Sequence, residues 1–461
     1  MNQTPIDAAI AEIRTLLADR LSTGRSVLEL HSHDEAYSEP ALPDAVAFPE
    51  TAKEVSEVMR ICTRYQCPVI PFGIGTSLEG HVIPTHGGIT IDTSRMNHIL
   101  EVHQSDFDAV VEPGVTRTQL NEALRDTGLM FTVDPGADAT IGGMASTRAS
   151  GTNTVRYGTM RENVLALQIV LPDGQIIETG TRARKSSAGY DLTHLFVGSE
   201  GTLGIITRVT VRLFGQPETI SAATCTFGSI DEAVDAVIMA IQMGIPVARV
   251  ELLDDVMMKG MNLYNPDLNF PEKPHLFLEF HGTETSVSEQ IDMFRGVSNE
   301  FDAGDFQWAS KNEDRNRLWQ ARHNAYYACK ALAPGAEAMV TDCCVPISAL
   351  AACIARTREL IQNTGLLAPL VGHVGDGNFH LSIMFDPQQP AQKQAAAGLA
   401  ASINDIALEF GGTVTGEHGI GIGKKKYMSA EHGAAYPLMG SIKKTVDPLN
   451  IMNPGKVVDV N

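Results

Sequence analysis

The sequence lacks any apolar run long enough to cross a membrane. A transmembrane helix needs about 20 consecutive, mostly apolar residues, and the apolar runs here are much shorter. The N-terminal residues also lack the basic and then apolar order of a secretory signal. We therefore expect a cytoplasmic protein, with peripheral attachment to the inner membrane as the alternative.

Cysteine is scarce and lacks the spacing of a disulfide or metal framework. The chain has seven cysteines, an odd number, and no CxxC pair. This usage is typical of reduced thiols in a reducing compartment. The adjacent Cys343 and Cys344 are expected to be core residues of a strand and not a redox pair.

Basic residues are few relative to acidic ones. The chain has 35 Lys and Arg against 55 Asp and Glu, which gives a formal net charge of −20. This balance argues against nucleic acids and anionic membranes as partners and is compatible with a basic protein partner. Any anionic substrate therefore needs a local positive site.

The glycine loops lack both common nucleotide fingerprints. A strand from Val69 leads into the loop Gly73–Gly80, where backbone N–H groups could approach a phosphate closely. The loop has no third glycine at the dinucleotide spacing, and no Lys-Ser/Thr pair follows it. The segment Gly419–Lys424 looks similar to a P-loop, but His418 stands where the first Gly of that pattern should be, and Lys425 stands where it needs Ser or Thr. Taken alone, Gly73–Gly80 could equally be a structural turn.

What the chain does have is length and an unusual number of small-residue loops. Its 461 residues exceed one ordinary core, so we expect two or more domains. The loops lie between Pro71 and Ile206, each at the end of a short apolar strand or before a helix. Their number indicates a long extended ligand laid across strand ends. The further loops are Val111–Gly114, Val133–Gly136, Ile141–Gly143, Gly151–Asn153, Tyr157–Gly158 and Gly198–Gly204.

A candidate metal site begins in the stretch Val371–His380. Asp376-Gly377 predicts a type I′ hairpin turn, because that turn needs positive φ at both central residues. In that register His373 faces His380, and directly opposed residues have Cβ atoms about 4.5–5.5 Å apart, close enough to share one divalent cation. Two opposed histidines alone are equally compatible with a solvated polar face.

A second segment, Gly416-Glu417-His418-Gly419, strengthens the metal interpretation. Glu417 supplies a carboxylate ligand, and His418 is a spare imidazole between flexible glycines. Two histidines and one carboxylate leave open coordination positions, which is typical of a working site and not of a structural one. The ligand types suit Zn or Mn and do not choose between them.

Several motifs occur in the order of a known flavoprotein family. The loops from Pro71 to Gly204 resemble the FAD-binding half of the vanillyl-alcohol oxidase/p-cresol methylhydroxylase (PCMH) flavoproteins. Within that superfamily the later motifs are similar to FAD-linked D-lactate dehydrogenases of the cytochrome type, and the resemblance covers nearly the whole chain after about residue 40. Those motifs are Leu318–Asn324, Thr341–Pro346, His373–His380, Gly416–Gly419 and Asn453–Lys456.

The resemblance implies an α+β fold, with a PCMH-type FAD-binding domain of two subdomains and a cap domain built on an antiparallel sheet. The glycine loops stop after Pro217, where strand and helix begin to alternate. We therefore predict an N-terminal helix and lead-in at 1–37, the FAD-binding domain at 38–216, the cap at 217–435 and a return to the FAD domain at 436–461.

The resemblance also implies FAD bound without a covalent link, because no family attachment motif is present, although His81 beside Gly80 keeps covalent attachment open. The implied FAD-binding residues are Pro71, Phe72, Gly73, Gly75, Thr76, Ser77, Leu78, Gly80, Pro113, Gly114, Asp134, Pro135, Thr140, Ile141, Gly142, Gly143, Ala145, Ser146, Gly151, Thr152, Asn153, Tyr157, Gly158, Glu200, Gly201, Gly204, Ile205, Ile206 and Asn453.

The implied reaction is oxidation of a D-2-hydroxy acid, D-lactate above all, to the 2-oxo acid. The flavin accepts the C2 hydrogen as hydride, and a metal at His373, His380 and Glu417 acidifies the substrate hydroxyl. His418 would take the proton, although it could instead be a fourth metal ligand. Arg322 would bind the substrate carboxylate, a role that the motif favours over a surface salt bridge, and Asn378 would add a hydrogen bond.

Other functions share parts of these patterns. Glycolate oxidase subunits and D-2-hydroxyglutarate dehydrogenases have much of the same motif order, and an oxidase would pass electrons to O2. The expected acceptors are otherwise a cytochrome c, a quinone or an electron-transfer flavoprotein. The oligomeric state is left open, with a homodimer as one candidate. A non-haem iron oxygenase would use the same metal ligands but would not need the glycine loops. A binding or scaffold protein would keep FAD and oxidise no 2-hydroxy acid.

Overall fold

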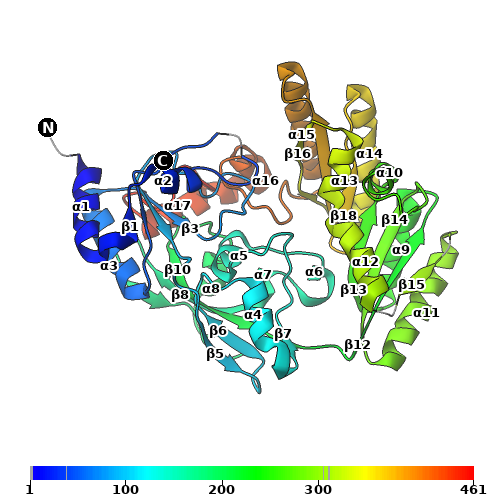
Figure 1. The fold of residues 1–461 in the computed structure, drawn as a ribbon, viewed down its shortest axis with the longest axis horizontal. Helices are drawn as coiled ribbons and strands as arrows, with labels where there is room; N and C mark the ends of the chain where they lie inside the picture. The colour runs from blue at the N-terminus through cyan, green and yellow to red at the C-terminus, as the bar shows by residue number, and fades with distance from the viewer. Residues whose placement is uncertain (1–3, 38, 305, 310–311, 461) are drawn as a thin grey trace. The chain divides into compact units, whose positions relative to one another are not determined.

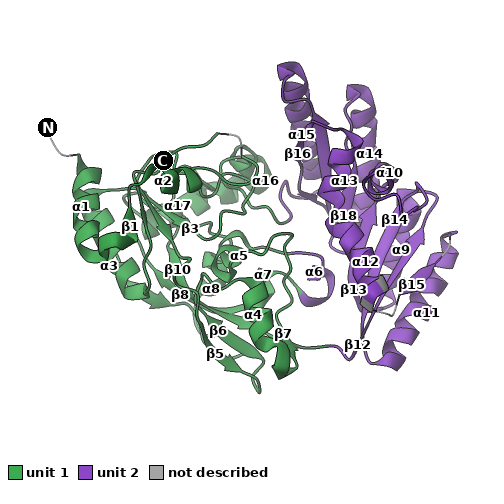
Figure 2. Cartoon of the chain, in the orientation of Figure 1, with its two compact units in different colours: residues 1–150, 158–216, 417–461 green, residues 151–157, 217–416 purple. Residues whose placement is uncertain are grey.

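The computed structural model describes residues 4–37, 39–304, 306–309 and 312–460. They form two compact units (Figure 2). The first unit holds residues 1–150, 158–216 and 417–461, and the second holds 151–157 and 217–416. The second unit is therefore an insertion between distant segments of the first. The domain boundaries expected from the sequence stay a prediction.

The first unit contains two main sheets (Figure 1). In one, β2, β4 and β3 are parallel and β1 is antiparallel to β2, and the buried faces of α1 and α3 pack on it. The strands and helices are β1 (Leu21–Ser22), β2 (Ala45–Ala47), β3 (Val69–Phe72), β4 (Ile89–Asp92), α1 (Pro5–Leu17), α2 (Arg25–Leu30) and α3 (Ala52–Tyr65).

The other main sheet of this unit is antiparallel, in the order β5-β6-β10-β8-β9, and encloses a separate hydrophobic core with α4 and α5. A two-stranded pair, β7 with β11, completes the unit. The elements are β5 (Ile99–His103), β6 (Asp108–Val111), β7 (Leu129–Met130), β8 (Val164–Val170), β9 (Ile176–Glu178), β10 (Ile205–Arg212), β11 (Phe214–Gly215), α4 (Arg117–Leu124), α5 (Ile141–Thr147), α7 (Met160–Asn163), α8 (Leu192–Phe196), α16 (Met428–His432) and α17 (Tyr436–Val446).

The last residues of the chain belong to the first unit through backbone pairing. Val69 N donates to the carbonyl of Ile451, and Asn453 N donates to the carbonyl of Val69. Asn453 Nδ2 donates to the carbonyls of His81 and Glu200 at 2.9 and 2.8 Å. The segment therefore closes one edge of the sheet beside the loop that follows β3.

The second unit is built on one antiparallel sheet in the order β15-β12-β14-β13-β18-β19-β16, with β17 also pairing with β19. One face packs against α9, α11, α14 and α15, and the other against α10, α12 and α13. The strands are β12 (Thr219–Thr226), β13 (Val247–Leu253), β14 (His275–Gly282), β15 (Gln307–Ala309), β16 (Glu337–Val340), β17 (Cys343–Cys344), β18 (Leu370–His373) and β19 (Asn378–Phe385).

Helix starts in both units follow local capping chemistry. Thr51 accepts a hydrogen bond from Glu54 N at the start of α3, and Ser229 and Glu232 form a capping box at the start of α9. The second-unit helices are α6 (Thr154–Tyr157), α9 (Ile230–Gln242), α10 (Asp255–Tyr264), α11 (Glu284–Glu300), α12 (Asn312–His323), α13 (Ala325–Leu332), α14 (Leu350–Thr364) and α15 (Pro390–Glu409).

The hairpin forms where expected, but its predicted register is wrong by two residues. Strands β18 and β19 pair His373 with Asn378 and Val371 with His380. Gly377 has a φ of 78°, whereas Asp376 is absent from the residues with positive φ, so the type I′ turn does not form. Asp376 N instead donates to the carbonyl of His373 at 3.0 Å, which makes a longer connection. Because the shift is an even number, both histidines stay on one face.

The cysteines agree with the sequence-based prediction except at Cys344, which was expected in the core and is only half-buried. All seven are free thiols, and all except Cys344 are buried. Cys343 and Cys344 form the short strand β17 and make no disulfide.

Candidate active site

Two imidazoles meet on the polar face of the β18–β19 hairpin. His373 and His380 are diagonal neighbours across the pair, with ring centroids 5.2 Å apart and planes at 81°. Each offers a ring nitrogen within 4.8 Å of the other's. One nitrogen of each ring could therefore coordinate the same cation.

Glu251 determines which nitrogen His373 presents. His373 Nδ1 donates to Glu251 Oε1 at 2.6 Å. A carboxylate only accepts, so the proton lies on Nδ1 and the lone pair lies on Nε2. This carboxylate–histidine arrangement is the usual support of a metal-binding imidazole.

Arg322 contacts the other oxygen of the same carboxylate. Its Nε and Nη2 donate to Glu251 Oε2 at 2.9 and 2.7 Å. Burial would raise the pKa of Glu251, but its interactions with His373 and Arg322 outweigh burial and hold the pKa below its ordinary value. Arg322 is thus oriented by a buried partner and is not a surface salt bridge.

The sequence-based reasoning missed Glu251. It lies inside the strand Val247–Leu253 and is 0% exposed. A carboxylate within an apolar strand is costly unless it is paired, and that was the available signal. Its two partners lie 71 and 122 residues away in the chain, so spacing could not identify them.

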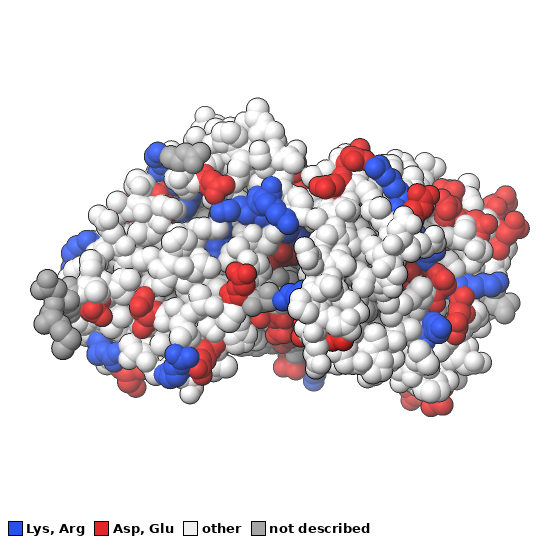
Figure 3. Space-filling view, turned by 90° about the horizontal axis from the view of Figure 1, so that it is seen from above, with Lys and Arg blue, Asp and Glu red and all other residues white. Residues whose placement is uncertain are grey.

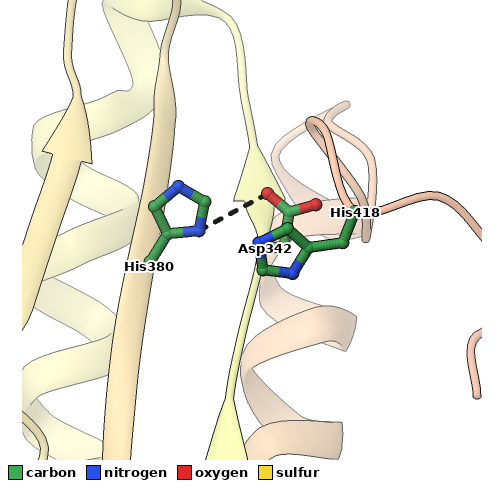
Figure 4. Close-up of side chains that lie close together, drawn as sticks. All are labelled: Asp342, His380 and His418. Carbon is green, nitrogen blue, oxygen red and sulfur yellow. Dashed lines mark ion pairs between the residues drawn. The ribbon is translucent and has the colours of Figure 1, made fainter. Parts of the chain in front are cut away.

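Asp342 was also missed, and it organises the surroundings of His380 (Figure 4). His380 Nδ1 donates to the carbonyl of Thr341 at 3.2 Å and lies 3.5 Å from Asp342 Oδ1. Asp342 also accepts from Thr415 Oγ1 at 2.9 Å, and its carbonyl accepts from Gly416 N. The Thr341 contact again leaves Nε2 of His380 with the lone pair.

Asn378 is engaged with its own unit. Its Nδ2 donates to Asp342 Oδ1 and to the carbonyl of Cys343, both at 2.9 Å. These contacts use the two N–H groups of the amide. Its oxygen is therefore the atom through which it could contact a substrate.

Glu417 and His418 begin the last segment of the first unit. Ser150 Oγ donates to Glu417 Oε2 at 2.6 Å. Beyond them, Ile420 N and Gly421 N each donate to Glu200 at 2.7 Å. In sequence Glu417 directly follows Gly416, whose backbone contacts Asp342.

Glu200 also pairs with His81 inside the first unit. His81 Nε2 lies 3.3 Å from Glu200 Oε2, and both side chains are buried. Burial opposes the charged form of each, but the pair outweighs it, so the pKa of His81 is raised and the pKa of Glu200 is lowered. Glu200, expected among the FAD-binding residues, therefore anchors the backbone that follows His418.

Most of the expected FAD-binding residues lie in the first unit, but four belong to the second: Gly151, Thr152, Asn153 and Tyr157. Asn153 Oδ1 accepts from Arg249 Nε at 2.9 Å. Tyr157 and His281 are hydrogen-bonded at 2.7 Å between Oη and Nδ1. These two side chains are therefore held by strands β13 and β14.

The loop after β3 suits a phosphate-bearing cofactor such as FAD. Ser77 Oγ is buried and has no hydrogen-bond partner within the described part of the chain. A buried hydroxyl in that state is the kind of group that a bound ligand satisfies. Hydroxyls and backbone N–H groups are also the donors that phosphate oxygens require.

Comparison with known proteins identifies the family. A model described as the C-terminal domain of FAD linked oxidases matches residues 216–457, and an FAD binding domain model matches residues 43–180. The chain belongs to the FAD-linked oxidases. The match confirms FAD as the cofactor and confirms the family resemblance drawn from the motifs.

Curated relatives cover almost the whole chain. A protein named probable D-lactate dehydrogenase, mitochondrial, from Danio rerio is 48% identical over 99% of this chain and 92% of its own length. The Arabidopsis thaliana protein named D-lactate dehydrogenase [cytochrome], mitochondrial, is 44% identical over 97% of this chain and 80% of its own length. A Saccharomyces cerevisiae protein of the same type is 39% identical over 98% of this chain and 80% of its own length. These relatives confirm the predicted oxidoreductase.

Solved structures agree with the predicted fold class. A p-cresol methylhydroxylase structure matches with a TM-score of 0.83 and 18% identity, covering 99% of this chain and 98% of that one. An alkyldihydroxyacetonephosphate synthase structure matches with a TM-score of 0.77 and 20% identity, covering 97% of this chain and 85% of that one. The expected α+β architecture with a PCMH-type FAD-binding domain is therefore confirmed.

The expected cytoplasmic location is contradicted. Four relatives, 37–48% identical, are named mitochondrial. The expectation rested on the absence of a signal pattern and of a long apolar run, and neither of these features identifies a compartment. Among the described residues, no helix combines the length and apolar character needed to cross a membrane.

Proposed function

We propose that the protein oxidises a D-2-hydroxy acid, with D-lactate the favoured substrate, to the 2-oxo acid and passes the electrons to FAD. The observation that carries the proposal is the set of relatives named D-lactate dehydrogenase, which match 97–99% of the chain. The cluster of Arg322 and His373 around the buried Glu251 supports it, since it supplies a cationic group beside a metal-binding type of imidazole.

We infer that His373, His380 and Glu417 hold one divalent cation, Zn or Mn. Support comes from the two histidines, whose Nδ1 atoms both donate to protein oxygens and so place the lone pair of each neutral ring on Nε2, as in a metal-binding imidazole. A cation at this position would lower the pKa of the substrate hydroxyl. His418 would take the proton, because it follows Glu417 directly and is the next imidazole in sequence.

Arg322 would bind the substrate carboxylate. Glu251 occupies the Nε and Nη2 donors, and a guanidinium has five N–H groups in a planar fork. The remaining N–H groups can meet a second carboxylate. The oxygen of Asn378 is available to accept a hydrogen bond from the substrate or from His418.

FAD would be held without a covalent link by the first-unit loops, and when bound it supplies the hydride acceptor. The buried Ser77 hydroxyl supports binding at the loop after β3. His81, the residue considered for covalent attachment, is paired with Glu200, which favours a structural role for this imidazole.

A cytochrome is the favoured electron acceptor, because relatives from A. thaliana and S. cerevisiae carry that word in their names. The net charge of −20 suits a basic electron-transfer protein. On the face drawn in Figure 3, many acidic side chains gather over the part of the view that belongs to the second unit. A quinone, an electron-transfer flavoprotein, O2 and a homodimer are the other partners to test.

Anaerobic bleaching of the flavin by a panel of hydroxy acids tests the proposal. We expect D-lactate to bleach the yellow protein quickly and L-lactate to leave it coloured. The panel includes glycolate, because a Bacillus subtilis relative named glycolate oxidase subunit GlcD is 34% identical, and D-2-hydroxyglutarate. If glycolate alone bleaches the flavin, glycolate and not D-lactate is the substrate. If none of the hydroxy acids bleaches the flavin, the proposed function is wrong.

A further inference from the structure

One buried carboxylate contacts two residues with different proposed tasks. Glu251 Oε1 accepts from His373 at 2.6 Å, while Oε2 accepts twice from Arg322, at 2.9 and 2.7 Å. The three residues come from β13, β18 and α12, all in the second unit. Glu251 is 0% exposed, so bulk solvent does not reach its oxygens.

We propose that Glu251 is a positioning residue that holds the metal-binding His373 and the carboxylate-binding Arg322 in one fixed geometry, an inference that rests on the proposed function. A 2-hydroxy acid carries its hydroxyl and its carboxylate on adjacent carbons. An imidazole for the cation and a guanidinium for the carboxylate must therefore lie at a short, constant separation. Sharing one carboxylate sets that separation.

A neighbouring cluster contains a second buried carboxylate, Glu279, which contacts a histidine that is not a proposed metal ligand. Glu279 lies on the adjacent strand β14, is buried, accepts from His281 Nε2 at 2.7 Å and lies 3.6 Å from Arg249. However, His281 uses Nδ1 as well, in its hydrogen bond with Tyr157. Both ring nitrogens of His281 are therefore used within the protein, whereas His373 contacts Glu251 through Nδ1, which places its lone pair on Nε2.

The substitution Glu251→Gln separates positioning from simple burial. Gln has the same shape, but only its oxygen accepts, so it cannot receive hydrogen bonds from both His373 and Arg322. If its amide faces His373, that ring must place its proton on Nε2 and lose the coordinating lone pair. If its amide faces Arg322, the guanidinium loses its orientation.

We would measure bound metal, the dissociation constant for Zn and Mn by competition with a chelator, and KM and kcat for D-lactate. For Glu251→Gln we expect one of two losses, set by the orientation of the amide: metal binding about 10–100-fold weaker if the amide faces His373, or a raised KM if it faces Arg322. The matched control Glu279→Gln removes another buried carboxylate, 4% exposed. It should keep wild-type metal affinity and KM, even if it unfolds at a lower temperature.

The outcomes separate this inference from the function on which it rests. Wild-type protein that binds no metal and is not bleached by D-lactate would end the proposed function itself. An active wild type with unchanged metal affinity and KM in Glu251→Gln would overturn the positioning role, as would equal losses in both variants. If Glu251→Gln does not fold, Glu251→Asp takes its place, because its shorter arm cannot reach both partners and should give one of the same two losses.

Discussion

Arg322 tests how the substrate carboxylate is bound. Lys in its place would keep the charge but lose the planar fork, so Arg322→Lys should not behave as a conservative change. A charge-assisted hydrogen bond contributes about 1.5–3 kcal/mol, which corresponds to a KM for D-lactate raised roughly 10–100-fold. The flavin absorbance spectrum should stay the same. If the variant has the steady-state kinetics of the wild type, Arg322 does not bind the substrate carboxylate.

His380 and His418 should respond differently to removal. His380→Ala removes a proposed ligand and should lose the metal, as measured by elemental analysis. His418→Ala removes the proposed base, so the metal should remain while kcat falls by about 10²–10⁴. Equal metal loss in both variants would make His418 a ligand, and full metal retention in both would exclude the histidine pair as the metal site.

Asp254 makes a pH-dependent contribution to stability away from the candidate site. It is buried and caps α10 by accepting from Met257 N at 2.8 Å. Burial raises its pKa from 3.8 to about 6. Since the folded state binds this proton more tightly, the free energy of unfolding should fall as pH rises from about 4 to about 6, by roughly 3 kcal/mol in all.

Asp254→Asn should remove that dependence while keeping a capping oxygen. Urea unfolding at pH 4.5 and pH 7 should show the variant gaining stability relative to wild type at the higher pH. Parallel changes in the two proteins would show that the pKa of Asp254 is not raised.

At the scale of elements, the β18–β19 hairpin depends on one glycine. Gly377 has a φ of 78°, and a Cβ there would overlap the carbonyl oxygen of Val345. Gly377→Ala should therefore lower the melting temperature and weaken metal binding. The control is Gly365→Ala, where φ is 67° but no atom lies within 4 Å of the added Cβ. It should cost only about 1 kcal/mol and leave metal binding unchanged. Equal effects of the two substitutions would show that the Val345 contact is unimportant.

The same hairpin shows how far sequence reasoning extends. The Asp-Gly pair located the turn, and alternation put both histidines on one face, because these signals are local. The register was missed because Asp376 does not take positive φ, and the connection is longer than two residues. Glu251 and Asp342 were missed because their partners come from distant strands and helices. The grouping of residues 151–157 with the second unit likewise depends on contacts with β13 and β14 that no motif records.

For the whole molecule, cofactor and metal should be separable. The expected FAD loops lie mostly in the first unit, whereas His373 and His380 lie in the second. A chelator should therefore abolish oxidation of D-lactate while FAD stays bound, as shown by the absorbance of the protein after gel filtration. Acid precipitation should then release the yellow colour into the supernatant. Loss of FAD with the metal, or colour retained in the pellet, would contradict this separation.

The insertion of the second unit into the first has a consequence for synthesis on the ribosome. Apart from the short segment 151–157, the second unit is one continuous stretch, 217–416, so it can fold as soon as that stretch has emerged. The first unit must wait, because Val69 pairs with Ile451 and Asn453 and β3 keeps an open edge until these residues are made. A chain stalled after Gly416 would carry every strand of the second unit together with an unclosed flavin unit. Such an intermediate has an unpaired strand edge, which favours aggregation, and it gives chaperones a defined stage at which to act.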